Sequence, residues 1–261
     1  MSRIQQILDK AERDGYSRQL RGVDPVAPSA PHSYPGEPGP VAAGLVPSRL
    51  VSGAFLSPAL ITADARDTVA VEQYRALRTR VQANGTNPAR VLLVTSPNTG
   101  DGKTITASNL ALAMAQEQKR RICLVEADFR RPCLQELFGL PDGPGLGEVL
   151  AGEVELRDAL IELEEHQLTV LPAGRVPARP SDQLGTINMR RTVDLLRTHH
   201  DRVVIDAPAV TPLADVNILS ALVDGVLLVV RAGVTSKPAI REAIAALDRA
   251  KLLGLVLNES T

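Results

Sequence analysis

The residues with the clearest chemical potential lie in the segment Ser96–Thr104, which reads SPNTGDGKT. Gly100 and Gly102 let backbone N–H groups turn inward around phosphate oxygens, because glycine has no Cβ to obstruct them. Lys103 can reach the β and γ phosphates, and the Thr104 hydroxyl can ligate Mg²⁺. The pattern predicts a loop that holds ATP with Mg²⁺. The residues expected to bind the nucleotide here are Thr99, Gly100, Asp101, Gly102, Lys103, Thr104 and Ile105.

The local context strengthens this prediction, although the match to G-x-x-x-x-G-K-[ST] is incomplete because Pro97 occupies the first glycine position. The apolar run Val91–Thr95 precedes the loop, and a segment with helical periodicity follows it. A helix that begins at Lys103 would direct the positive end of its dipole toward the phosphates. The alternative is an ordinary strand–turn–helix with an exposed lysine, which this context disfavours.

Carboxylates follow two other predicted strands. Glu126 and Asp128 stand at the end of ICLVEAD, and Asp206 stands at the end of VVID. In a parallel sheet these strand ends lie on the same edge as the phosphate loop, where a carboxylate can hold Mg²⁺ or accept a proton. Each one alone could instead cap a helix. Asn258 ends a further strand, and its amide could read an adenine edge or form a turn.

The elements that must position these residues alternate along the chain from residue 90 onward. Short runs rich in Val, Leu and Ile predict the strands Val91–Thr95, Ile122–Glu126, Leu168–Leu171, Val203–Asp206, Val226–Val230 and Leu253–Leu257. Helical periodicity predicts the helices Lys103–Gln118, Pro132–Phe138, Asn188–Thr198, Ala214–Leu222 and Pro238–Ala250. The alternation predicts an α/β fold whose mostly parallel sheet carries helices on both faces.

The N-terminal part of the chain has a different character. Residues 1–21 contain a short amphipathic helix pattern, and residues 22–63 form a linker and lead-in that begins rich in Pro and Gly. The nucleotide-binding domain is then expected over residues 64–261. Its first helix, over residues 66–83, has Asp67 or Thr68 as its N-cap.

The composition narrows the possible partners. A net charge of -1 gives no general attraction to nucleic acid, and 2% aromatic residues offer few surfaces for base stacking. The two cysteines, Cys123 and Cys133, form no Cys-x-x-Cys pair, which favours a reduced cytoplasmic protein. No apolar run is long enough for a signal peptide or a membrane span, so we expect any work at a membrane to need a partner.

Taken in order, the motifs resemble the bacterial protein-tyrosine kinases of capsule and exopolysaccharide synthesis, which are P-loop NTPases related in fold to the partitioning ATPases. The resemblance covers about residues 66–258. TSPNTGDGKT is similar to the Walker A loop of that family, LVEADFRRP to its second Walker motif, and VVIDAP to its Walker B strand. LPAG with PARPSDQL, DGVLLVVRAGVTS and GLVLN resemble later segments of the family.

The resemblance implies a role for each of these residues. Lys103 and Thr104 would bind phosphate and Mg²⁺, and Asp128 and Asp206 would hold the metal environment. Glu126 stands where the family usually has Asp, at the position of the catalytic base or a metal contact. Phosphate would pass from ATP to a tyrosine hydroxyl.

The resemblance also implies partners. Glu72, Arg75 and Arg78 fit the family's E-x-x-R-x-x-R helix, which packs on the neighbouring subunit of a homo-oligomeric ring; a solvated charged face is the alternative. A separate transmembrane activator, the polysaccharide co-polymerase, would recruit the cytoplasmic chain to the inner face of the membrane. The substrate tyrosine would lie on another protein, or be Tyr16 or Tyr34.

Two further functions remain open. Glu126 and the lack of a C-terminal tyrosine cluster are compatible with a weak or inactive ATP-binding scaffold that regulates polysaccharide synthesis. A partitioning-type ATPase shares the expected fold, but that class carries a signature lysine where this chain has Asn98. We therefore expect a protein-tyrosine kinase first, a scaffold second and a partitioning ATPase third.

Overall fold

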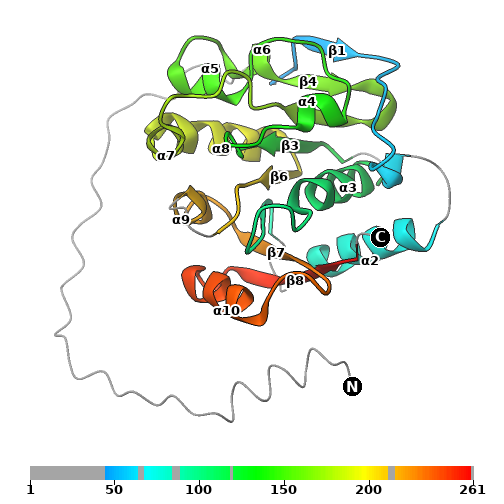
Figure 1. Ribbon diagram of the computed structural model, residues 1–261. Coiled ribbons are helices and arrows are strands. Elements are labelled where there is room, and N and C mark those ends of the chain that lie inside the picture. Colours follow the sequence, from blue (N-terminus) through cyan, green and yellow to red (C-terminus); the bar gives the residue numbers. More distant parts are fainter. Residues whose placement is uncertain (1–44, 64–67, 84–88, 118–119, 211–214, 260–261) are drawn as a thin grey trace. The chain divides into compact units, whose positions relative to one another are not determined.

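The computed structural model describes residues 45–63, 68–83, 89–117, 120–210 and 215–259, which build an eight-stranded sheet with helices on both faces (Figure 1). The strand order is β1-β4-β5-β3-β6-β2-β7-β8, and all neighbours are parallel except the antiparallel pair β4 and β5. The predicted fold class is therefore confirmed. The strands are β1 (Arg49–Val51), β2 (Val91–Thr95), β3 (Ile122–Glu126), β4 (Ile161–Leu163), β5 (Leu168–Leu171), β6 (Arg202–Asp206), β7 (Gly225–Arg231) and β8 (Leu252–Asn258).

The helices form two layers, with α2, α3 and α4 on one face of the sheet and α5 to α10 on the other. Alternate residues of β2 supply both halves of the core: Val91 and Leu93 face one layer, and Leu92 and Val94 face the other. A strand covered on both faces must be apolar at every position, which explains the continuous runs in the sequence. The helices are α2 (Val69–Gln82), α3 (Lys103–Ala115), α4 (Leu134–Leu137), α5 (Leu146–Ala151), α6 (Leu156–Ala159), α7 (Pro180–Leu184), α8 (Ile187–His199), α9 (Asp215–Ser220) and α10 (Lys237–Ala246), with 3₁₀ turns η1 (Ile61–Ala63) and η2 (Glu164–His166).

The capping of the long helices distinguishes α3 from the others. Thr68, Thr186 and Ser236 cap α2, α8 and α10 with side-chain oxygens that accept hydrogen bonds from first-turn N–H groups. The N-cap of α3 is Gly102, which makes no side-chain hydrogen bond. The first N–H groups of α3 therefore receive no capping side chain and can bind a ligand.

The lead-in expected over residues 22–63 contributes to the sheet at its described end. Residues Arg49–Val51 pair in parallel with Ile161–Leu163 as β1 and β4, two three-residue strands that the sequence pattern did not predict. The helix expected over residues 1–21, the linker as far as residue 44 and the candidate cap Asp67 lie outside the described residues. Within those residues, no helix is long and apolar enough to cross a membrane.

Candidate nucleotide-binding site

The phosphate loop connects β2 to α3, and its shape depends on two glycines. Gly100 and Gly102 have φ angles of 90° and 95°, in the left-handed region that favours glycine. A Cβ on Gly102 would lie 2.0 Å from Nδ2 of Asn258, whereas a Cβ on Gly100 would meet no atom within 4 Å. Gly102 thus lets the end of β8 approach the loop, and Gly100 borders open space that a ligand can occupy. Thr99 is exposed in the loop, and Ile105 lies in the first turn of α3.

Four of the predicted functional residues meet at the carboxyl ends of the central strands. Lys103 Nζ lies 2.7 Å from Asp128 Oδ2 and 3.3 Å from the hydroxyl oxygen of Thr104. The Thr104 hydroxyl donates to Asp206 Oδ2 over 2.7 Å. All four residues are buried, and Asp206 is 0% exposed. The structure thus brings Lys103, Thr104, Asp128 and Asp206 together in one cluster, and their roles in binding ATP and Mg²⁺ stay a prediction.

The electrostatics of this cluster follow from its burial. Burial raises the pKa of Asp206 to about 7, although the Lys103 charge and the Thr104 hydroxyl oppose the shift. Burial also acts to lower the pKa of Lys103, but the charges of Asp206 and Asp128 outweigh it, and the pKa of Lys103 is raised. Lys103 therefore stays charged and compensates the two carboxylates.

The oxygen atoms of the cluster fit Mg²⁺ bound with a nucleotide. Oδ1 of Asp206 is buried and has no hydrogen-bond partner among the described residues. A buried oxygen of this kind is costly unless a ligand or ion completes it. Mg²⁺ in such sites takes one or two carboxylates, a hydroxyl and phosphate oxygens, so the set Thr104, Asp128 and Asp206 is suitable. Within the described residues no group of three or more His, Cys, Asp or Glu forms a separate metal site.

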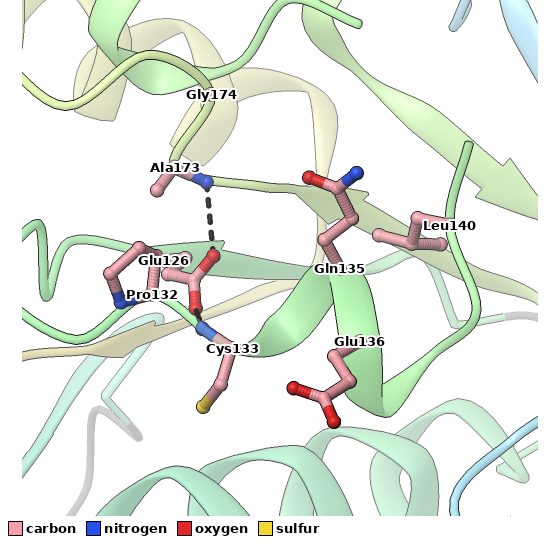
Figure 2. A pocket seen from close by; sticks show the side chains of 8 residues that line it. All are labelled: Glu126, Pro132, Cys133, Gln135, Glu136, Leu140, Ala173 and Gly174. Atoms are coloured by element: carbon pink, nitrogen blue, oxygen red, sulfur yellow. Dashed lines mark hydrogen bonds between the residues drawn. The ribbon is translucent and has the colours of Figure 1, made fainter. Parts of the chain in front are cut away.

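Glu126 is the predicted site residue whose contacts differ most from the expectation. Its Oε1 accepts hydrogen bonds from the N–H groups of Cys133 (2.5 Å) and Leu134 (2.7 Å), and its Oε2 accepts one from Ala173 (3.1 Å). Figure 2 shows this carboxylate between the start of α4 and the segment after β5. Burial raises the pKa of Glu126, and the three hydrogen bonds oppose the shift. The carboxylate therefore connects the main chain at the start of α4 to the main chain after β5.

A cavity of about 400 Å³ lies beside Glu126, and Figure 2 shows the side chains around it. Pro132, Cys133, Gln135 and Leu140 line it together with Gly174. The Cys133 thiol interacts with Thr104 and with the charge of Lys103, so the cavity lies next to the phosphate-site cluster. Burial raises the pKa of Cys133 to about 11, which keeps the thiol protonated.

Asn258 contacts the phosphate loop itself. Its Nδ2 donates to the Asp101 carbonyl over 3.0 Å, and Asp101 is buried in the loop. The Asp101 carboxylate also accepts a hydrogen bond from Thr235, a residue that the sequence analysis did not single out. Thr235 lies within the family-like segment DGVLLVVRAGVTS, but its partner is 134 residues away in the chain, so local pattern gave no signal for the contact.

The candidate interface residues lie on α2, which packs against α3 of the same chain. Glu72 and Arg75 form an ion pair. Arg78 donates to the carbonyl of Ala113, in the last turn of α3, over 2.7 Å. Burial raises the pKa of Tyr74, whose side chain hydrogen-bonds to α3. This helix therefore contacts α3 along its length, from Thr106 in the first turn, which interacts with Tyr74, to Ala113 in the last turn, which binds Arg78.

A second contact that sequence reasoning missed fixes the turn after β3. Arg130 Nε lies 3.2 Å from Oδ2 of Asp215, and Asp215 is buried at the start of α9. Arg130 belongs to the motif LVEADFRRP, but no motif includes Asp215. The ion pair connects the turn that carries Asp128 to the helix that follows β6.

Comparison with protein-family models gives no match. Among curated proteins, the chain is 34% identical over 190 residues to the tyrosine-protein kinase YwqD of Bacillus subtilis (strain 168), covering 72% of this chain and 80% of that protein. The likeness therefore covers most of the length of both proteins.

Several solved structures are also similar to this chain. The chimerical protein CapA2B2 aligns with a TM-score of 0.74 at 28% identity, covering 81% of this chain and 94% of that chain. The kinase domain of the Escherichia coli tyrosine kinase ETK aligns with a TM-score of 0.72 at 30% identity, covering 77% and 82%. A Mycobacterium smegmatis cobyrinic acid a,c-diamide synthase, solved with an ATP analogue and magnesium, aligns with a TM-score of 0.52 at 27% identity, covering 64% and 74%.

Proposed function

Because this chain belongs to the bacterial tyrosine-protein kinases, we propose that it transfers the γ-phosphoryl group of ATP to tyrosine hydroxyls of proteins. The observation that carries the proposal is the buried cluster of Lys103, Thr104, Asp128 and Asp206 beside a glycine-bearing loop. On the basis of the family resemblance, we propose that this activity controls the synthesis and export of capsular polysaccharide or exopolysaccharide.

In this proposal the chain binds the phosphates through main-chain groups and one cation. The loop N–H groups and the uncapped first turn of α3 face the phosphate oxygens. Lys103 reaches the β and γ phosphates and neutralises charge that develops during transfer. Its present partner Asp128 then loses one ion-pair contact and becomes available to the metal environment. Phosphoryl transfer of this kind depends mainly on positioning and charge neutralisation.

Thr104, Asp128 and Asp206 would hold Mg²⁺. When bound, the ion neutralises the phosphate oxygens and fixes their orientation. The support for this set is the unpartnered Oδ1 of Asp206 beside the Thr104 hydroxyl. The structural neighbour that was solved with an ATP analogue and magnesium supports the binding of a nucleotide and magnesium in general.

For Glu126 the contacts favour a positioning role over proton transfer. Both of its oxygens accept main-chain hydrogen bonds, three in all, and would have to give some of them up to take a substrate proton. A loose transition state with little nucleophile deprotonation makes a strong base unnecessary. We therefore assign Glu126 to holding α4 and the segment after β5 next to the phosphate site.

Assembly and location are further proposals that rest on the family resemblance. We propose a homo-oligomeric ring in which Glu72, Arg75 and Arg78 contribute to the contact between subunits. Arg78 also hydrogen-bonds within its own chain, so its substitution affects both. A separate transmembrane activator would bring the chain to the inner face of the cell membrane, and Asn258 would contact the adenine if its amide turns from the loop.

A regulatory ATP-binding scaffold without phosphoryl transfer is the second candidate. The observation in its favour is the same engagement of Glu126, because a residue at the position of the family base is bound to main-chain groups here. The scaffold keeps the nucleotide site and the ring but transfers no phosphate.

One experiment separates these functions. The purified full chain is incubated with γ-labelled ATP and Mg²⁺, with and without the cytoplasmic segment of a membrane partner, beside Lys103→Ala. Lys237→Ala, at the exposed start of α10, serves as the matched control. Label on tyrosine that disappears in Lys103→Ala alone supports the kinase. Released phosphate without labelled protein indicates an ATPase, and ATP binding with neither result indicates the scaffold.

A further inference from the structure

The carboxylate of Asp101 joins two parts of the chain that are far apart in sequence. Its Oδ2 accepts a hydrogen bond from the N–H of Asn98 over 2.9 Å, which closes the phosphate loop on itself. Its Oδ1 accepts a hydrogen bond from the hydroxyl of Thr235 over 2.7 Å, which ties the loop to the segment after β7. Asp101 is 2% exposed, so water does not replace these contacts easily.

Thr235 is itself held by a turn. The N–H of Arg231 donates to the Thr235 hydroxyl oxygen over 2.9 Å, and the N–H of Thr235 donates to the Arg231 carbonyl over 3.0 Å. The hydroxyl therefore accepts from the end of β7 and donates to Asp101. With its proton direction fixed in this way, it gives the loop carboxylate a preferred position.

Asn258 supports the loop beside this contact. The side-chain Nδ2 of Asn258 donates to the main-chain carbonyl of Asp101, and the main-chain carbonyl of Asn258 accepts from the N–H of Ala232 over 2.9 Å. The side chain lies directly against Gly102, where no Cβ could fit. The ends of β7 and β8 thus contact the two loop residues that precede Lys103.

These contacts matter for binding because a phosphate loop acts through the direction of its N–H groups. A loop that samples many conformations loses entropy when phosphate orders it, and its affinity falls accordingly. A loop already held at Asn98 and Asp101 avoids most of that loss. Asp101, which makes these contacts, lies between Gly100 and Gly102, the two loop residues with positive φ angles.

We propose that Thr235 is a positioning residue for nucleotide binding, which holds the phosphate loop in its binding conformation through the Asp101 carboxylate before the nucleotide arrives. Asn258 assists through the Asp101 carbonyl. The proposal rests on the proposed function in one respect, since it assumes that nucleotide phosphates bind in this loop. It adds a residue outside the Walker motifs to the nucleotide site.

The test uses Thr235→Val, which keeps the side-chain shape and removes the hydroxyl, and Thr235→Ser, which keeps the hydroxyl. Calorimetry measures the Kd of the full chain for ATP with Mg²⁺, and a labelled-phosphate assay measures kcat and KM. Thr235→Val is expected to weaken binding about fivefold to tenfold, with kcat at saturating ATP within about twofold of the wild type. Thr235→Ser should bind as the wild type does.

A second measurement reads the loop directly. Hydrogen exchange at the amides of residues 98–102 in the nucleotide-free chain should be faster in Thr235→Val than in Thr235→Ser. Thr198→Val, which removes an exposed helix hydroxyl bonded to Asp194, is the control for loss of a hydroxyl elsewhere. Thr235→Ala replaces the valine variant if that variant does not fold.

The outcomes distinguish this proposal from the function on which it rests. If the wild-type chain binds no adenine nucleotide, the proposed function is wrong. If the wild type binds ATP and Thr235→Val binds equally well with unchanged loop exchange, only the role of Thr235 is overturned. A lower melting temperature with unchanged Kd would also overturn it, because Thr235 would then act on folding alone.

Discussion

The hydroxyl of Thr104 donates a hydrogen bond to Oδ2 of Asp206 over 2.7 Å, which connects the first turn of α3 to the end of β6. Thr104→Ala removes a hydroxyl that we place among the Mg²⁺ ligands and leaves the second Asp206 oxygen unpartnered. We expect the dependence of ATP affinity on Mg²⁺ to fall at least about tenfold, while Thr104→Ser stays near the wild type. Titration with ATP in Mg²⁺ and in EDTA measures this, and equal Mg²⁺ dependence in all three proteins would refute the metal assignment.

Asp206→Asn should change the pH dependence of stability. The pKa of Asp206 is raised from 3.8 to about 7 in the folded chain, so the folded state holds the proton more tightly than the unfolded state. Stability from this group is therefore present below pH 3.8 and is lost as the pH rises from 3.8 through about 7. In EDTA, Asp206→Asn should be more stable than the wild type at pH 8 by a few kcal/mol, with little difference at pH 4. Urea unfolding at both pH values measures this, and a pH-independent difference would contradict it.

Lys103→Ala should destabilise the nucleotide-free chain as well as remove nucleotide binding. Its ammonium group lies 2.7 Å from Asp128, and without it two buried carboxylates lose their cation. Breaking one partner of a buried ion pair typically costs about 3–5 kcal/mol. Adding Asp128→Asn to Lys103→Ala should restore part of the lost unfolding free energy, although neither protein binds ATP. Additive losses in the double variant would show that the pair is not coupled.

Glu126→Gln tests the role of the carboxylate at the start of α4. The glutamine amide must direct an N–H₂ group at a main-chain N–H, so we expect a loss of about 1–3 kcal/mol in unfolding free energy. Phosphoryl transfer should fall together with stability, and Glu126→Asp, which is one methylene shorter, should not restore either. Glu136→Gln, at an exposed residue beside the same cavity, is the control. Normal stability with greatly reduced kcat would instead identify Glu126 as the base.

Two substitutions in α2 test its contribution to folding and its contribution to assembly separately. Arg78→Ala removes the hydrogen bond to the Ala113 carbonyl and should lower the unfolding free energy by about 1 kcal/mol. Glu72→Ala, at a side chain that is 61% exposed, should leave folding unchanged and reduce ring formation. Light scattering and thermal unfolding of both variants measure the two effects. An unchanged assembly size in both would argue against α2 as the contact between subunits.

The sequence predicted best what depends on continuous apolar runs and strand ends. Both faces of the central strands are covered, so β2, β3 and β5 could be predicted with their observed bounds. Parallel strands end on one edge of the sheet, so Asp128, just after β3, and Asp206, the last residue of β6, both lie close to Lys103 and Thr104. The strands β1 and β4 are three residues each, too short to leave a periodic signal.

What the sequence could not predict depends on the direction of individual side chains. Glu126 ends β3 in register with Asp206, but its carboxylate turns to the N–H groups of α4 and Ala173. Nothing in the local pattern indicates that choice. Likewise, the partner of Thr235 is Asp101, and only the folded sheet brings β7 and the loop together.

The burial of α3 restricts which segments of this protein can move when ATP is exchanged for ADP. All residues of α3 except Ile105 are buried, so the helix cannot slide along its axis without disrupting the core on every side. Its first turn follows directly on the phosphate loop, and its last turn accepts the hydrogen bond from Arg78. Because α3 is held by the core on every side, we expect an exchange of ATP for ADP to move the segments around the phosphate loop more than α3 itself.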